Sequence, residues 1–234
     1  MLDSMEKLIR EHNMLPKGSR VLCAVSGGAD SVCLLHRLWT LREQLEIEVV
    51  AAHYQHGLRG KESERDEAFV RKIAEELGGI PLVVGRGNVA RQARESGRGI
   101  EETAREMRYR FLRQAAQEVQ AEYIATAHNA NDNAETVLMH LVRGTGLRGL
   151  TGIAPVRGNI IRPLLTTTRY EIEEYIKKYR LSYVIDSSNQ DDTYTRNRIR
   201  HQILPELDMI CPGAVERLTR TSESLRRDER FLME

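Results

Sequence analysis

The sequence predicts an α/β protein with a doubly wound, mainly parallel five-stranded sheet, helices on both faces, and a helical C-terminal extension. Compact apolar runs alternate with segments of helical spacing as far as about residue 165, an order typical of parallel sheets covered on both faces. Beyond about residue 169 the pattern becomes mostly helical and polar. We therefore expect one domain over residues 1–168 and a mostly helical extension with a linker helix over residues 169–234.

Each expected element follows from its local pattern. Met5, Leu8 and Ile9 have the spacing of a short amphipathic helix that ends before Pro16. Apolar or helix-forming positions predict further helices over 31–45, 63–77, 100–119 and 134–142. Short apolar runs predict strands over 20–25, 47–53, 80–84, 123–127 and 159–165. The charged segment 217–234 ends without a capping glycine, so we expect the natural chain to continue past Glu234.

The composition limits the function classes. Hydrophobic residues make up 41% and charged residues 29% of the 234 positions, as in packed globular proteins. The formal net charge of +1 gives no argument for nucleic acid, although arginines gather over 86–113 and 143–169. The three cysteines form no CxxC pair, which suits a reducing compartment. We find no apolar signal core and no run of membrane length, so we expect a cytoplasmic protein with no membrane partner.

Between the first expected strand and the first long helix lies a six-residue loop, Ser26-Gly27-Gly28-Ala29-Asp30-Ser31. Its two adjacent glycines let the backbone turn sharply, and the following helix offers free N–H groups to an anion. A carboxylate at Asp30 repels phosphate unless a divalent cation lies between them, so Asp30 implies Mg²⁺. The alternative is a plain turn in which Asp30 and Ser31 cap the helix. No lysine of the Walker type follows the glycines.

The fourth expected strand is followed by a histidine and two carboxylates. His128, Asp132 and Glu135 stand at i, i+4 and i+7, which is one face if the helix begins near His128. Such a group can bind an ammonium group, hold a metal or move a proton. The alternative is a helix cap with acidic residues in the first turn, which the helix dipole also favours.

These strings resemble a known superfamily. The loop has the S-G-G-x-D-S signature of the N-type ATP pyrophosphatases, the PP-loop superfamily. Within it, the chain is similar to the tRNA(Ile)-lysidine synthases over nearly its whole length. The strings that carry this similarity include H-G-L-R-G at 56–60, I-E-E-T-A-R at 100–105, R-G-T-G at 143–146, I-R-P-L at 161–164 and R-N-R-I-R-H at 196–201. Asn131 departs from that family, many of whose members have aspartate there.

The resemblance implies an ATP-dependent carbon–nitrogen ligase that forms lysidine. In such enzymes ATP adenylates the ring carbonyl oxygen of a cytidine in the tRNA(Ile) anticodon and releases pyrophosphate. The amine of free L-lysine then displaces AMP. The resemblance further implies that the loop Ser26–Ser31 holds pyrophosphate, that Asp30 binds Mg²⁺ together with ATP, and that Arg108 steadies the phosphates or the adenylate.

Roles for the other candidate residues also follow from the resemblance. Asp132 and Glu135 are expected to bind the ammonium groups of lysine, and His128 to assist the adenylate or a proton transfer. Three arginines, Arg196, Arg198 and Arg200, are expected to contact the RNA backbone. The sequence leaves open whether the protein forms a homo-oligomer.

Three alternatives are weighed against the ligase. A tRNA thiolase has the same core, but one with a cluster bound by CxxC pairs is disfavoured by the isolated cysteines. An amide-forming synthetase of the NAD or GMP synthetase type explains the loop but not the arginine-rich string 196–200. A nucleotide-binding module without catalysis leaves the polar residues at the strand ends without a role.

Overall fold

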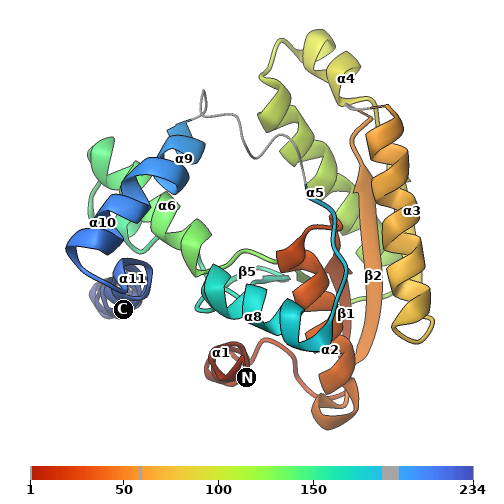
Figure 1. Cartoon of the computed structure of the whole chain (residues 1–234), viewed down its shortest axis with the longest axis horizontal. Helices are drawn as coiled ribbons and strands as arrows, with labels where there is room; N and C mark the ends of the chain where they lie inside the picture. Colours follow the sequence, from red (N-terminus) through yellow and green to blue (C-terminus); the bar gives the residue numbers. More distant parts are fainter. Residues whose placement is uncertain (1, 58–59, 186–194, 234) are drawn as a thin grey trace.

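The computed structural model describes residues 2–57, 60–185 and 195–233, and its centre is a single sheet. The strand order is β3-β2-β1-β4-β6-β5. Figure 1 labels three of these strands, β1, β2 and β5. The strands are β1 (Arg20–Ala24), β2 (Glu48–Gln55), β3 (Leu82–Arg86), β4 (Tyr123–Ala125), β5 (Val156–Arg157) and β6 (Ile160–Ile161). Neighbouring strands pair in parallel except β5 and β6. The predicted α/β class with a mainly parallel sheet is confirmed.

The predicted strand count of five is wrong, because the described sheet has six strands. The segment expected as one strand over 159–165 contributes only β6, which forms a hairpin with β5. Val156 pairs with Ile161, and Gly158 in the turn has φ +60°. Each of these two strands has two residues. That length is too short for the alternating pattern by which a strand is recognised in sequence.

The predicted helices are confirmed, with shifted ends. They are α1 (Asp3–Glu11), α2 (Ala29–Leu45), α3 (Lys61–Glu76), α5 (Ile100–Glu118) and α6 (Ala130–Val142). The others are α4 (Val89–Ser96), α7 (Leu147–Leu150), α8 (Arg169–Tyr179), α9 (Thr195–Arg198), the π-helix η2 (Ile199–Ile203), α10 (Leu204–Ile210) and α11 (Ala214–Met233). The start of α6 lies ahead of the predicted residue 134 because Asn129 caps it. No helix within the described ranges is long and apolar enough to cross a membrane.

Each face of the sheet has its own core. Val21 and Cys23 of β1 pack with α1, α2, α3 and α8, whereas Leu22 between them packs with α5 on the opposite face. This alternation follows from the period of two along a strand. Residues 21–23 are all fully buried. The sheet therefore holds the ends of β1 and β4, after which the candidate residues lie, in a fixed relation.

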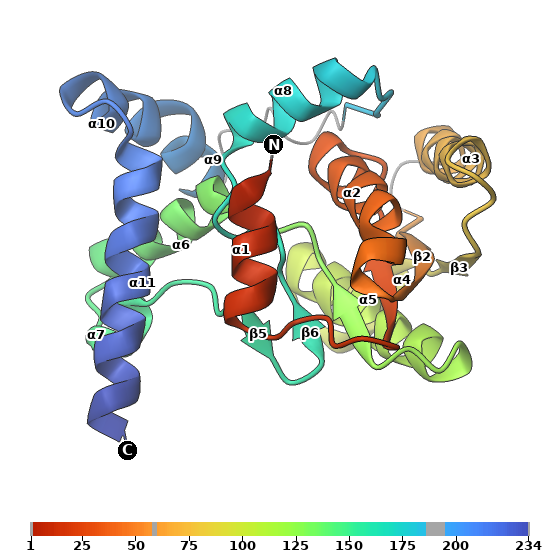
Figure 2. The same ribbon diagram turned by 90° about the horizontal axis from the view of Figure 1, so that it is seen from below.

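The C-terminal helices pack mainly on α6. Ile199 and Leu204 form a third apolar cluster with Ala134 of α6. Asn133 of α6 donates from Nδ2 to Ser222 Oγ of α11 at 2.8 Å. Figure 2 shows α11 running past α6 and α7, away from the sheet. In contrast, α8 packs on α2 within the main core, so the division between domains at residue 168 stays a prediction.

Candidate active site

The loop Ser26–Ser31 is shaped by one glycine and one hydroxyl. Gly27 has φ +98°, a backbone conformation that side-chain-bearing residues rarely adopt. Ser31 Oγ accepts from the N–H groups of Ser26 and Gly27, both at 3.2 Å, and donates to the Gly28 carbonyl at 2.9 Å. The hydroxyl of Ser31 therefore holds the loop in shape from inside.

The amides at the start of α2 are free to bind an anion. Gly28 is the N-cap residue of α2 and provides no side-chain cap. Within the described ranges no acceptor bonds the N–H groups of Ala29, Asp30 or Ser31, and Val32 is the first residue of α2 to bond back, to Gly28. The amide of Gly27 is therefore engaged in shaping the loop, and the free N–H donors are those of the first turn of α2.

Asp30 points from α2 toward the N-terminus of α6. Its side chain is 27% exposed, and Oδ2 lies 3.9 Å from Arg169 Nη1. The other oxygen, Oδ1, is buried with no hydrogen-bond partner among the described residues. Burial raises the pKa of Asp30 to about 6, while Arg169 lowers it and the nearby Asp132 raises it further.

The environment of Asp30 fits a divalent cation. A cation beside Oδ1 gives that orphaned oxygen a partner and favours the ionised carboxylate. Among the described residues, no group of three or more His, Cys, Asp or Glu side chains can hold a metal. Magnesium is commonly held by one or two carboxylates together with substrate phosphates, which suits a single aspartate beside an anion-binding loop.

Asn129 and Asp132 hold each other at the start of α6. Asn129, with 1% of its surface exposed, accepts from Asp132 N at 3.0 Å, and its own N–H donates to Asp132 Oδ2 at 3.1 Å. This is a capping box. The side chain of Asn129 also lowers the pKa of Asp30 by hydrogen bonding. Because α6 begins at Ala130, His128 precedes the helix, and the expected single face of His128, Asp132 and Glu135 is wrong.

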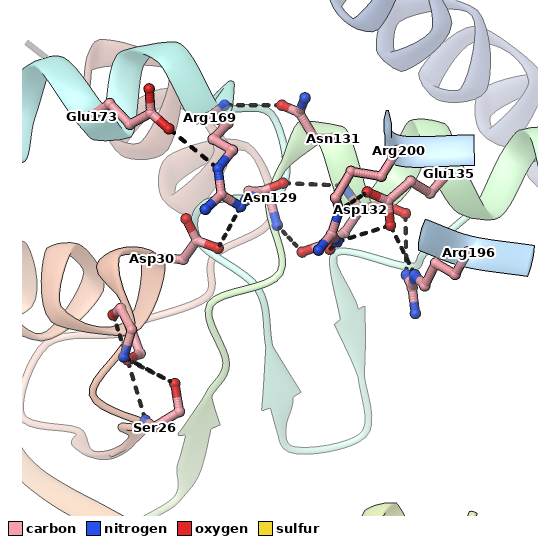
Figure 3. A network of polar contacts seen from close by, with 12 residues as sticks. Ser26, Asp30, Asn129, Asn131, Asp132, Glu135, Arg169, Glu173, Arg196 and Arg200 are labelled. Carbon is pink, nitrogen blue, oxygen red and sulfur yellow. Dashed lines mark hydrogen bonds and ion pairs between the residues drawn. The ribbon is translucent and has the colours of Figure 1, made fainter. Parts of the chain in front are cut away.

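Glu135 is fully buried and bound by two arginines (Figure 3). Arg200 donates from Nε to Glu135 Oε1 at 2.6 Å and from Nη2 to Oε2 at 3.1 Å. Arg196 donates from Nε to Glu135 Oε2 at 2.8 Å. Arg200 Nη2 also lies 3.3 Å from Asp132 Oδ1. Arg196 and Arg200 thus bind Glu135, whereas Arg198 is exposed, and the expectation that all three arginines contact the RNA backbone stays a prediction.

A second link joins α6 to α8. Asn131 Oδ1 accepts from the backbone N–H of Arg169 at 2.9 Å, and the Arg169 guanidinium reaches Asp30 (Figure 3). Sequence reasoning assigned no site role to Arg169, Asn129 or Asn131. An available signal was the spacing Asn129-x-x-Asp132, which fits a capping box. No local signal pairs Arg169 with Asp30, because the two residues are distant in sequence.

His128 and Arg108 lie in a cationic group on the α5 side of the site. Nδ1 of His128 is 3.0 Å from Thr126 Oγ1. Burial lowers the pKa of His128 to about 3, and the charges of Arg162, Arg108 and Arg105 lower it further. Burial also lowers the pKa of Arg108. His128 is therefore neutral near pH 7, and the surrounding arginines favour an anion.

Arg162, in the I-R-P-L string, is a buried member of this group that sequence reasoning did not assign to the site. It is 5% exposed and donates from Nη1 to the Ala154 carbonyl at 2.5 Å, while its Nε has no partner among the described residues. Because the Ala154 carbonyl carries no formal charge, this hydrogen bond does not neutralise the positive charge of Arg162.

Comparison with known families decides the assignment. A family model described as the PP-loop domain matches residues 2–207. The chain belongs to the PP-loop family. We propose the loop Ser26–Ser31, which leads into α2, as the PP-loop of this chain.

Curated relatives carry one name. The tRNA(Ile)-lysidine synthase of Clostridioides difficile (strain 630) is 42% identical over 99% of this PP-loop chain and 50% of the relative. The enzyme of Porphyromonas gingivalis (strain ATCC BAA-308 / W83) is 47% identical over 93% of this chain and 47% of the relative. The enzyme of Bacillus subtilis (strain 168) is 42% identical over 99% of this chain and 49% of the relative. The chain spans about half the length of the curated relatives it matches.

Two solved structures have the same PP-loop fold. The U34-tRNA thiolase NcsA from Methanococcus maripaludis, with its [4Fe-4S] cluster, has a TM-score of 0.75 at 19% identity over 96% of this chain and 78% of that one. The NH3-dependent NAD synthetase from Campylobacter jejuni subsp. jejuni NCTC 11168, in complex with nitrate, has a TM-score of 0.52 at 14% identity over 96% and 94%. These likenesses support the fold alone.

Proposed function

We propose that the protein ligates L-lysine to an anticodon cytidine of tRNA(Ile), forming lysidine through an adenylated cytidine with release of AMP and pyrophosphate. The similarity to tRNA(Ile)-lysidine synthases covers 99% of the chain at 42% identity. The observation that carries the proposal is the juxtaposition of the free amides of the PP-loop with Asp30 and with the carboxylates of α6. Adenylation and amine attack need an anion site and a cation site side by side, and these residues supply both.

The PP-loop is the proposed pyrophosphate site. The N–H groups of Ala29, Asp30 and Ser31 have no acceptor among the described residues, and hydrogen bonds to a charged phosphate contribute roughly 1.5–3 kcal/mol each. Asp30 would hold Mg²⁺ together with ATP, and bound Mg²⁺ would offset the charge that develops on the leaving pyrophosphate.

On the acceptor side, Arg108 and the neutral His128 line the proposed position of the adenylate. Arg108 favours the phosphoryl oxygens, and His128, held neutral by burial and the nearby arginines, can assist the adenylate by hydrogen bonding. Asp132 is the proposed partner of the lysine ammonium, because its side chain keeps partial exposure of 18%, whereas Glu135 has none. Arg198 is the proposed contact to the RNA backbone. We further propose a cytoplasmic location, where tRNA and free lysine are available.

The decisive experiment measures AMP and pyrophosphate release with labelled lysine and tRNA(Ile) transcript, omitting each substrate in turn. The ligase predicts that label enters the tRNA only when ATP, Mg²⁺, lysine and tRNA(Ile) are all present. A transcript whose anticodon cytidine is replaced by uridine should take up no label. Pyrophosphate release with tRNA but without any transfer of lysine would instead indicate adenylation for another purpose.

A thiolase of the cluster-bearing type is not favoured. Cys23 and Cys33 are buried in the main core, and burial raises the pKa of both thiols, Cys33 to about 12. Thiolates, rather than thiols, bind metals. These two cysteines are therefore poor candidates for cluster ligands.

A further inference from the structure

Glu135 makes the C-terminal helices part of the site. The carboxylate has no exposed surface, and both of its oxygens accept hydrogen bonds from guanidinium groups of the segment α9–η2. A buried carboxylate is stable only when it is paired and hydrogen-bonded. Arg196 and Arg200 are the residues that meet this requirement among those described.

The pairing engages Nε and Nη2 of both guanidinium groups. Arg200 forms a fork on Glu135 through Nε and Nη2, and its Nη2 also reaches Asp132. Arg196 Nη2 lies 3.4 Å from the Asp132 carbonyl and 3.3 Å from Thr136 Oγ1, in addition to the bond from Nε to Glu135. Forked guanidinium–carboxylate pairs fix orientation as well as charge.

A contact to an RNA phosphate through Nε or Nη2 of either arginine would break the bonds of that arginine to Glu135. The buried Glu135 carboxylate would then lose part of its charge pairing, which is destabilising. Arg198 faces no such cost, because it lies exposed on the same short segment.

We propose that Arg196 and Arg200 are positioning residues that hold the carboxylates of Glu135 and Asp132, and that they do not contact the RNA backbone. They orient Asp132 toward the ammonium of the amine substrate and fasten α9 and η2 onto α6. The part of this proposal that concerns lysine rests on the proposed function, whereas the internal pairing does not.

Salt-dependent tRNA binding separates positioning from RNA contact. Arg196→Gln, Arg198→Gln and Arg200→Gln each remove one positive charge from one short segment, so they are matched variants. We expect Arg198→Gln to reduce the slope of log K against log salt by roughly 0.7–0.9, the change for one lost phosphate contact. The variants at 196 and 200 should keep the wild-type slope. A reduced slope for Arg200→Gln or Arg196→Gln would overturn the proposal.

A double-mutant cycle tests the pairing without any substrate. We expect Arg200→Gln to lower the unfolding temperature by about 10 °C, and Glu135→Gln to recover a large part of that loss in the Arg200→Gln background. Additive losses would contradict the pairing. Should Arg200→Gln fail to fold, Arg200→Lys replaces it in the unfolding cycle, because lysine keeps the charge but loses the fork, and Arg196→Gln alone decides the binding assay.

Steady-state kinetics at saturating tRNA compare the KM for lysine with the KM for ATP. A purely structural role of Arg200 would not change the KM for lysine selectively. We expect Arg200→Lys to raise KM for lysine on the order of tenfold while KM for ATP changes little. Equal increases in both constants would refute a role in orienting Asp132. Absence of lysine-dependent turnover in the wild type would reject the proposed function, and the unfolding cycle would still decide the pairing.

Discussion

Asn129 and Asp132 bond each other twice, each accepting from the backbone N–H group of the other at 3.0–3.1 Å. The pair sets where α6 begins and which way the Asp132 carboxylate faces. Asn129 also reaches Asp30, so one buried amide lies between the PP-loop and the carboxylates of α6. The N-terminus of α6 therefore contacts both Asp30 and the Asp132 carboxylate.

Asn129→Ala should lower the stability of the protein and weaken its use of lysine. Loss of an N-cap side chain costs about 1 kcal/mol, and Asp132 loses the partner that orients it. We expect a lower unfolding temperature and a raised KM for lysine. Asn88→Ala is the matched control, because Asn88 caps α4 by accepting from Arg91 N at 2.9 Å. It should lower stability similarly and leave KM for lysine near wild type; an equal change in KM would contradict the assignment.

Asp30→Asn should stabilise the free protein above neutral pH while abolishing ATP use. The folded-state pKa of about 6 lies above the ordinary 3.8, so the stability contributed by Asp30 is present below 3.8 and is lost as the pH rises through about 6. We expect the variant to unfold at a higher temperature than wild type at pH 8, with the difference vanishing near pH 3. Thermal unfolding across this pH range measures it.

Two comparisons make the Asp30 result specific. Exposed Asp228→Asn should show no such pH-dependent gain. Mg²⁺ with ATP should raise the unfolding temperature of wild type but not of Asp30→Asn. A wild type that is as stable as Asp30→Asn at pH 8 would contradict the burial of the Asp30 carboxylate, whose Oδ1 has no partner among the described residues.

His128 should stay neutral throughout the physiological range. Its pKa of about 3 lies below the ordinary 6.5, so the stability it contributes is present above 6.5 and is lost as the pH falls toward 3. NMR titration of the imidazole should show no inflection between pH 5 and pH 8. Arg108→Gln removes one of the lowering charges and should raise the pKa. Arg113→Gln, on an exposed position of the same helix, should leave it unchanged.

Gly27→Ala should damage the PP-loop through its backbone. An alanine at φ +98° costs roughly 1–2 kcal/mol, although the added Cβ meets Phe69 at an ordinary 3.4 Å. Gly18→Ala is the control, since Gly18 has φ +78° with open space around it and precedes β1 rather than following it. Both variants should lose similar stability, and Gly27→Ala should also weaken nucleotide binding in calorimetry. Equal nucleotide affinity in the two variants would exclude the loop as the phosphate site.

Local patterns in the chain were enough to predict the mainly parallel sheet and the main helices, and they singled out the loop Ser26–Ser31. Residues 21–23 alternate between two cores because side chains along a strand alternate, and Gly27, which follows β1, has the positive φ that a glycine allows. Such features depend on neighbours within a few positions, so they can be read along the chain. The hairpin of β5 and β6 was missed because strands of two residues carry no period.

The partners of the charged residues could not be read in this way. Arg196 and Arg200 looked like surface cations, yet they bind Glu135 across 61 and 65 positions of sequence. Asp30 meets Arg169 only because α8 packs against α2. Packing in three dimensions selects which carboxylate each guanidinium meets, and burial then decides the cost of leaving either one alone. A pattern of charges in one dimension contains neither quantity.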